Sequence, residues 1–217
     1  MQRLRVKFGR GQELKYISHL DLMRLWERAL RRAGMPIAYS QGFSPRPRLS
    51  IAAPLPIGVT SKGELIDIFV AWRASPSFFT KAVAAKLPPG IEILEIKEIW
   101  PNLPSLQSQV RYAEYRVEIE SERELKEVQL AIRSLLSREH LPWQHIRDKQ
   151  VRKYDLRALI HDLWLEDWHG TRCTLGMRLR TDSRGAGRPE QVTLALGFAQ
   201  QPQSIHRTKL ILAGQAR

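Results

Sequence analysis

The first 100 residues change their hydrophobic period several times, and this order of periods restricts the fold more than any other feature of the sequence. Polar and apolar residues alternate in three segments, as they do in strands with one buried face. These strand-like segments are residues 3–8, 63–72 and 91–100. Helical spacing appears between them, at residues 19–33 and 75–87. Short extended stretches precede the second long strand, so the order is β-α-β-β-α-β, which is the ferredoxin-like pattern.

End signals support the two helices. Ser18 is typical of an N-cap, with Asp21 at the third helical position as a short capping-box acid. Gly34 is placed to end that helix in the left-handed conformation. Ser75 caps the next helix, with Pro76 at its first position.

The second half repeats the order of elements with little residue identity. Alternating strands are expected at 111–120, 171–181 and 205–212, and helices at 121–139 and 187–197. Ser121 and Glu124 have capping-box spacing. Residues 151–168 should be extended at least in part. The sequence therefore predicts an α+β chain of two ferredoxin-like (βαββαβ) domains in tandem, at 1–100 and 111–217, with 101–110 as the linker.

The charge of the chain favours a polyanionic partner. The formal net charge is +13. Residues 1–50 contain eleven lysines and arginines against three acids, which is most of that excess. Such a balance is typical of proteins that bind nucleic acid or an anionic membrane surface.

A single cysteine, Cys173, allows no intrachain disulfide and no iron–sulfur cluster held by this chain alone. The first residues lack the apolar core of a signal peptide, and no apolar run reaches the length of a transmembrane helix. We therefore expect a cytoplasmic protein with no membrane partner.

The first helix carries an arginine stripe. At 100° per residue, Arg24, Arg28, Arg31 and Arg32 fall within about 100° of arc, opposite the apolar face. The stripe could bind phosphates, or it could be an ordinary solvated helix face relieved by a Glu27–Arg31 pair.

Residues 39–50, YSQGFSPRPRLS, are stiff and contain no acid. Pro45 and Pro47 restrict the backbone around Arg46, so Arg46 and Arg48 should project from an extended segment. Phe43 offers a stacking face and Gln41 could contact a base edge. These residue types suit single-stranded RNA. The alternative is a hairpin whose prolines protect an edge strand, with Phe43 in the core.

The second half offers further cations for an anionic ligand. Lys153 and Arg157 lie within the stretch VRKYDLR, where Asp155 could also form an ion pair with a neighbouring arginine. Arg188 stands at the start of a predicted helix, where the helix dipole disfavours a cation, so it should have another partner. Arg207 lies in the last predicted strand.

Catalytic patterns are few. The sequence contains no P-loop, no G-x-G-x-x-G, no H-E-x-x-H and no G-x-S-x-G. His19, Tyr16 and Asp21 near the first helix could support RNA cleavage by acid–base catalysis without a metal. Equally, they could be a helix cap with a surface histidine. No metal and no cofactor is expected in this chain.

The segment 17–68, ISHLDLMRLWERALRRAGMPIAYSQGFSPRPRLSIAAPLPIGVTSKGELIDI, resembles the bacterial radical-SAM-linked family of unknown function. KYDLR, GRPEQV and IHRTKLIL resemble later motifs of that family. The resemblance implies a module encoded within or beside a radical SAM protein, and an association with RNA or ribosome biology. The C-x-x-x-C-x-x-C cluster motif is absent, so a radical SAM partner would supply the chemistry.

Three hypotheses follow from these residues. The first is an RNA-binding accessory module, for tRNA or rRNA and without DNA specificity, that acts with a radical SAM partner. The second is a metal-independent endoribonuclease. The third is a protein-interaction subunit of a radical SAM enzyme that does not contact RNA.

Overall fold

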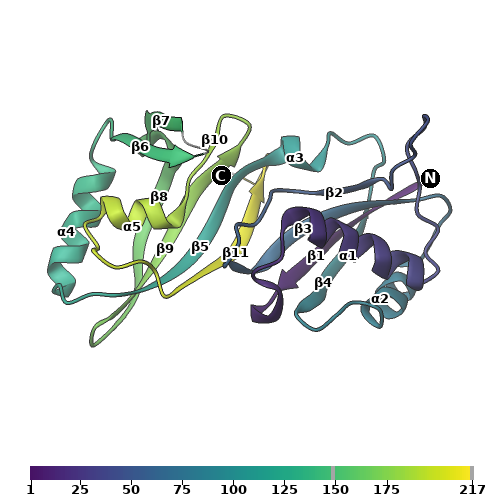
Figure 1. Cartoon of the computed structure of the whole chain (residues 1–217), viewed down its shortest axis with the longest axis horizontal. Helices are drawn as coiled ribbons and strands as arrows, with labels where there is room; N and C mark the ends of the chain where they lie inside the picture. Colours follow the sequence, from purple (N-terminus) through teal and green to yellow (C-terminus); the bar gives the residue numbers. More distant parts are fainter. Residues whose placement is uncertain (148–149, 216–217) are drawn as a thin grey trace. The chain divides into compact units, whose positions relative to one another are not determined.

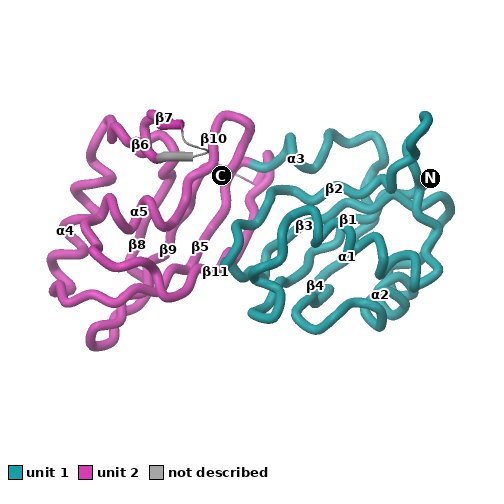
Figure 2. Tube along the Cα trace, viewed as in Figure 1, with its two compact units in different colours: residues 1–110 teal, residues 111–217 magenta. Residues whose placement is uncertain are grey.

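The computed structural model describes residues 1–147 and 150–215 of an α+β protein with extensive sheet and few helices (Figure 1). The chain forms two compact units, one from Met1 to Val110 and the other from Arg111 onward (Figure 2). We describe each unit by itself.

The first unit follows the predicted order of elements. Its strands and helices are β1 (Gln2–Arg10), the 3-10 turn η1 (Gln12–Leu14), α1 (His19–Arg32), β2 (Leu49–Ile51), β3 (Thr60–Val70), α2 (Pro76–Ala84), β4 (Ile91–Ile99) and α3 (Leu106–Gln109). The strand order is β4-β1-β3-β2, and each of the three pairings is antiparallel.

The two longer helices cover one face of this sheet. Leu4, Val6 and Phe8 of β1 alternate with polar residues, and all three are buried in the same core as α1 and α2. Trp26 of α1 packs edge-on against Phe8, with ring centroids 5.1 Å apart. Phe79 of α2 is buried in the same core.

The opposite face of the sheet holds a buried ionic group. Asp67 of β3 accepts from Arg3 at 2.6 Å and from Arg5 at 2.8 Å, and the Asp67 side chain is fully buried. Arg3 also donates to the carbonyls of Leu103 and Pro104, at 2.6 and 3.0 Å. These bonds hold the segment after β4 against the sheet.

The second unit contains the same kinds of element with one insertion. They are β5 (Val110–Glu120), α4 (Leu125–Leu136), β6 (Pro142–Arg147), β7 (Gln150–Asp155), the 3-10 turn η2 (Arg157–Leu159), β8 (Ile160–His169), β9 (Arg172–Asp182), β10 (Gly185–Ala186), α5 (Pro189–Ala195) and β11 (Ser204–Leu212). The main strands run in the order β11-β5-β9-β8, and β6 and β7 form a separate hairpin.

The sequence predicts that alternate residues of β9 form a buried apolar face, and the structure confirms this face. Cys173, Leu175, Met177 and Leu179 are each at most 1 % exposed. Val128, Ile132 and Leu135 of α4 are buried as well.

Several helix ends agree with the sequence. Ser18 accepts from the backbone N–H of Asp21, and Ser75 accepts from that of Phe78. Gly34 has φ +66°, in the left-handed region, directly after the end of α1. Pro76 and Pro189 begin α2 and α5.

Three local predictions differ from the structure. The start of α4 was wrong, because Glu124 is its N-cap and forms the capping box with Glu127, while Ser121 accepts a bond from Arg123 in the preceding turn. One of the short extended stretches before the second long strand, residues 36–40, was expected as a strand, but it makes only isolated bridges, since Pro36 and Pro47 cannot donate to a ladder. The segment expected as the linker contains α3, whose Leu106 is fully buried.

Candidate nucleic-acid interface

The arginines of α1 divide into paired and unpaired side chains. Arg24 lies 3.5 Å from Asp21, and Arg31 lies 2.7 Å from Glu27. Arg31 also donates to the Tyr39 hydroxyl at 3.1 Å. Arg28 and Arg32 have no ion-pair partner among the residues that the structure describes. The stripe is therefore in part the solvated face that the alternative interpretation proposed.

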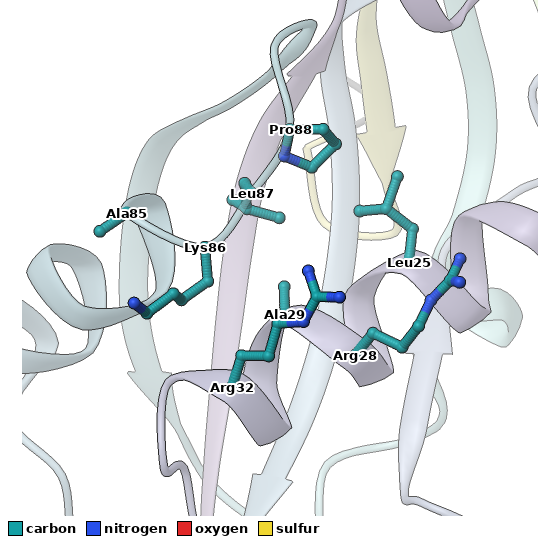
Figure 3. Close-up of a pocket in the computed structure, with 8 residues that line it drawn as sticks. All are labelled: Leu25, Arg28, Ala29, Arg32, Ala85, Lys86, Leu87 and Pro88. Atoms are coloured by element: carbon teal, nitrogen blue, oxygen red, sulfur yellow. The ribbon is translucent and has the colours of Figure 1, made fainter.

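Arg28 and Arg32 line a groove between α1 and the turn after α2 (Figure 3). The groove has a volume of about 430 Å³. Lys86 is its third cation, and none of its eight lining residues is acidic. Leu25 and Leu87 give the groove apolar walls. Three cations with no acid between them make a site for an anion.

The arginine stripe of the sequence includes Arg28, but no sequence pattern selects Lys86. Lys86 follows the end of α2, and its N–H donates to the carbonyl of Val83. A cation in the last turn of a helix is favoured by the dipole. The PPG sequence that ends this helix indicates where the chain turns, but only the packing of the two helices shows that Lys86 lines the same groove as Arg32.

The loop from Tyr39 to Arg48 is closed by backbone hydrogen bonds. Arg48 N–H donates to Ala38 O, and Ser40 N–H donates to Arg46 O, each at 2.8 Å. Gly42 at the tip has φ +124°. Phe43 is fully exposed, which excludes the core position that the alternative proposed for it. Gln41 is exposed beside it.

Arg46 and Arg48 have different surroundings. Arg46 is exposed, and its backbone N–H donates to Ser40 Oγ at 3.0 Å. The guanidinium of Arg48 lies over the ring of Phe69 at 4.1 Å. The structure therefore leaves Arg46 with Phe43 on the outside of the loop, while Arg48 is partly engaged with the body of the unit.

The three weak catalytic candidates do not form an oriented group. Asp21 is occupied by the cap and by Arg24, and it accepts from the Ser18 hydroxyl at 2.7 Å. Lys15 lies over the ring of Tyr16, which is 70 % exposed. His19 has no hydrogen-bond partner among the described residues. A general base is normally oriented by a second group, and none is seen here.

In the second unit, Asp155 and Arg157 organise the backbone. Asp155 accepts from the backbone N–H of Leu141 and of Arg157, and from His140. The hydrogen bond from His140, followed by that from Leu141, lowers the pKa of Asp155. Arg157 donates to the carbonyls of Leu136, Arg138 and Ile160. Its fork thus satisfies carbonyls at the end of α4 and is not directed at a ligand.

Five other cations of this unit line a pocket of about 500 Å³. Its basic lining residues are Arg152 and Lys153 of β7, Arg180 of β9, Arg184 of the turn before β10, and Arg188 at the start of α5. Asp155 is its only acid among the lining residues that the structure describes. The structure thus brings Lys153 and Arg188, two of the predicted residues, to one site.

Polar and apolar groups complete this pocket. Burial raises the pKa of Tyr154, so its hydroxyl stays protonated and donates to Gln191. The ring of His145 packs edge-on against that of Tyr154, with centroids 5.5 Å apart. A Cβ on Gly187 would lie 3.0 Å from the carbonyl oxygen of Leu159. This glycine lets the GAGRP segment lie against η2 and form one wall.

Two other predicted features lie away from any open surface. The Arg207 side chain is fully buried in β11. Burial raises the pKa of Cys173 to about 11, so its thiol is protonated and inert at neutral pH. Among the described residues, no three histidines, cysteines or acids gather closely enough to hold a metal ion. Within the same residues, none of the helices has the length and apolar character needed to span a membrane.

Fold and site together define an α+β protein with a cation-lined cavity in each of its two units. The sequence pattern of one family matches residues 3–189. The chain belongs to this family, which is described as uncharacterized proteins conserved in bacteria (DUF2344). No curated protein matches the chain in sequence.

Solved structures resemble the chain in fold alone. One is the crystal structure of a Cbf5-Nop10-Gar1 complex, with a TM-score of 0.53, 8 % identity and 95 % of this chain covered. Another is the structure of an H/ACA RNP bound to a substrate RNA containing 2′-deoxyuridine, with a TM-score of 0.49, 10 % identity and 95 % of this chain covered. This chain spans about half of each matched chain, 48 % and 47 %.

Proposed function

We propose that the protein is a cytoplasmic RNA-binding accessory module, for tRNA or rRNA, that acts with a radical SAM partner in RNA modification or maturation. The observation that carries the RNA part is the surface of the first unit. It presents the exposed ring of Phe43 beside Arg46, and a groove with Arg28, Arg32 and Lys86 and no acid.

This pairing of a stacking ring with unpaired cations favours RNA over other polyanions. An exposed aromatic ring stacks on an unstacked base, and cations follow the phosphate backbone. A membrane surface would attract the cations, but stable binding to it also requires an apolar face that inserts. The tip of the loop offers one ring, which the polar residues Gln41, Ser44 and Arg46 surround.

We further propose that each unit is a ferredoxin-like domain. The strand orders β4-β1-β3-β2 and β11-β5-β9-β8 support this, because each places the first and third main strands at the centre. The hairpin β6–β7 is then an insertion between α4 and β8. Strand pairings measured by NMR in each unit would test the assignment.

The partner protein is proposed from the family resemblance and from one surface feature. Trp72 and Trp100 are 67 % and 81 % exposed. Val70, at the end of β3, and Ile99, at the end of β4, pair with residues at the start of β1. Trp72 and Trp100 follow these residues, so both tryptophans lie at the same end of the sheet. Exposed tryptophans at one site are typical of protein interfaces.

The RNA proposal is tested by binding of a 5′-hydroxyl single-stranded RNA to the whole chain at 50–200 mM salt. We expect the log of the affinity to fall linearly with the log of the salt concentration. Changing Arg28, Arg32 and Lys86 to Gln should lower the slope by about 2, since each single-strand phosphate contact contributes about 0.7.

The matched control changes three exposed cations of the second unit, Lys126, Arg133 and Arg172, to Gln. These side chains lie outside both cavities, so the slope should change less. An affinity that does not depend on salt, or equal slopes for the two triple variants, would reject the interface. RNA that copurifies at low salt, followed by sequencing, would identify the natural ligand.

The partner proposal has its own test. A pull-down from cells that contain the neighbouring radical SAM protein should recover it with the wild-type chain. Trp72→Ala/Trp100→Ala should lose it, while Leu130→Ala, an exposed apolar residue of α4, should retain it. Recovery by all three chains would place the contact elsewhere.

The endoribonuclease alternative predicts RNA cleavage in EDTA that His19→Ala abolishes. The isolated position of His19 gives it less support than the binding module. Stable complex formation with the partner and no RNA binding would instead favour the protein-interaction subunit.

A further inference from the structure

The pocket of the second unit contains three cations without a counter-ion among the described residues. Arg180 is paired with Asp182 at 2.9 Å. Arg184 shares the charge of Asp182 with Arg180. Arg152, Lys153 and Arg188 have no ion-pair or hydrogen-bond partner for their side chains among the described residues. They come from two separate elements that meet at one pocket. Cations held this close repel one another unless an anion lies between them.

The single acid of the pocket does not neutralise them. Asp155 is occupied by three hydrogen bonds, from Leu141, Arg157 and His140. None of these donors is a lysine or arginine that lines the pocket. The pocket therefore keeps its positive charge.

The other lining groups suit the body of a nucleotide. The Tyr154 hydroxyl donates to the side-chain oxygen of Gln191. The amide N–H groups of Gln191 can then donate to a ligand. The Nδ1 atom of His145 is buried and has no partner among the described residues. Ala158, Leu159 and Ala186 add apolar surface. At about 500 Å³ the pocket is within the range of small-molecule sites.

We propose that this pocket binds the terminal phosphate of a nucleotide, a phosphomonoester carried by a mononucleotide or by the 5′ end of an RNA. A phosphomonoester carries a charge of about −1.5 to −2 at neutral pH, whereas a backbone diester carries one negative charge. Arginine forks bind such groups through two parallel hydrogen bonds. A concave site with three unpaired cations suits the doubly charged end of a nucleotide better than a backbone diester with a single charge.

This inference does not rest on RNA binding by the first unit, because a free mononucleotide would satisfy it. The proposed function is judged by the salt dependence of a 5′-hydroxyl RNA. The pocket is judged only by the effect of the terminal phosphate.

The experiment uses the full chain and two pairs of probes in calorimetric titrations. One pair is adenosine 5′-monophosphate and adenosine. The other is an RNA 8-mer with a 5′-phosphate and the same 8-mer with a 5′-hydroxyl. In at least one pair we expect the phosphorylated member to bind at least 10-fold tighter, the effect of one or two charge-assisted hydrogen bonds.

Arg184→Gln/Arg188→Gln should abolish that preference, and so should Arg152→Gln on β7. Lys126→Gln/Arg133→Gln, with the same charge change on α4, should retain it. All of these side chains are exposed, so folding should survive, as circular dichroism would verify.

The outcomes separate the two sources of the phosphate. A preference for the mononucleotide alone indicates a free nucleotide as the ligand, and a preference in the RNA pair indicates an RNA end. Equal binding within both pairs overturns the proposal. A preference that survives both pocket variants overturns it as well.

Discussion

The two units each have a groove between a long helix and the turn after the second helix, but the grooves differ in charge and size. In the first unit, Leu25, Arg28, Ala29 and Arg32 of α1 line a groove of about 430 Å³. In the second unit, Ala131, Ser134, Leu135 and Arg138 line one of about 220 Å³. Both sets have the spacing i, i+3, i+4, i+7, so equivalent helix faces form both grooves.

The substitutions at matching positions explain the difference. Ser134 stands where Arg28 does, which removes a cation. Leu135 stands where Ala29 does, and its larger side chain fills space. The turn at residues 195–197 contributes no counterpart of Lys86. The shared arrangement of helices provides the groove, and three residues set how wide it is and how many cations line it.

The second unit places its unpaired cations elsewhere. Its basic pocket uses the hairpin β6–β7 and the segment before α5, and the first unit contains no such hairpin between α1 and β3 in its described chain. The inserted element therefore creates a site that the shared arrangement lacks.

A second pair of equivalent positions gives the largest expected effect. Arg5 of β1 faces Asp67 of β3 in the sheet register, and Glu114 of β5 faces Arg178 of β9. Asp67 is buried with Arg3, whereas the Arg178 side chain is 32 % exposed. Asp67→Asn should cost about 3–5 kcal/mol of unfolding free energy, because it leaves a buried arginine without its counter-charge. Glu114→Gln should cost about 1 kcal/mol or less.

Urea unfolding followed by tryptophan fluorescence measures both costs. Glu114→Gln serves as the matched control, since it removes the same charge from the same kind of strand pair. If the two substitutions cost the same, burial is not what distinguishes the two ion pairs.

Phe43 gives the next effect in size. Stacking of one base on an aromatic ring contributes about 1–3 kcal/mol, so Phe43→Ala should weaken RNA binding by about 5- to 100-fold. The control is Phe78→Ala, since Phe78 is also exposed, at 58 %, but lies on α2. Equal losses of affinity, measured by fluorescence anisotropy, would remove the loop from the interface.

Much of the fold follows from local sequence rules. The alternation in β1, β3 and β9 and the caps of α1 and α2 depend on neighbouring residues, so the sequence predicts them. The start of α4 was misplaced because two overlapping capping signals exist, Ser121 with Glu124 and Glu124 with Glu127. Only the surrounding packing decides between them.

The sites were less predictable, because they depend on contacts between distant residues. The sequence motifs predict Lys153 and Arg188 as ligand contacts, but Arg180 and Arg184 join them only because β7, β9 and the turn before β10 meet at one pocket. Arg157 illustrates the opposite error. Its place in a basic stretch suggested a ligand contact, while in the structure it satisfies carbonyls at the end of α4. The sequence shows which residues are charged, but it does not show which of them pair with one another in the fold.

A substitution of Asp155 tests whether the segment KYDLR, residues 153–157, organises the backbone around it. Its folded-state pKa is lowered, chiefly by the hydrogen bond from His140, so its stabilisation is present above the unfolded pKa of about 3.9. This contribution is lost as the pH falls through the lower folded value. Asp155→Asn should therefore lower Tm by roughly 2–4 °C at pH 7, with the difference closing below about pH 4.

The measurement is thermal unfolding of both chains between pH 3 and 7. Glu139→Gln removes the same charge from an exposed neighbour and should leave Tm nearly unchanged. A Tm difference for Asp155→Asn that stays constant down to pH 3 would show that the carboxylate charge is not involved.

The smallest expected effect returns to the two grooves. Ser134→Arg gives the groove of the second unit a cation at the position of Arg28, next to Arg138. The groove stays narrow because Leu135 remains, so we expect RNA affinity to rise by only about 2- to 5-fold, as for one exposed phosphate contact at low salt. Lys126 does not line this groove, so Lys126→Gln in the same background should leave the gain unchanged. If Ser134→Arg raises affinity as much as Arg28→Gln lowers it, charge alone decides which groove binds. If it has no effect, RNA binding also requires the larger groove volume that Ala29 leaves in the first unit. The shape of the groove, and not its charge alone, then distinguishes the two units.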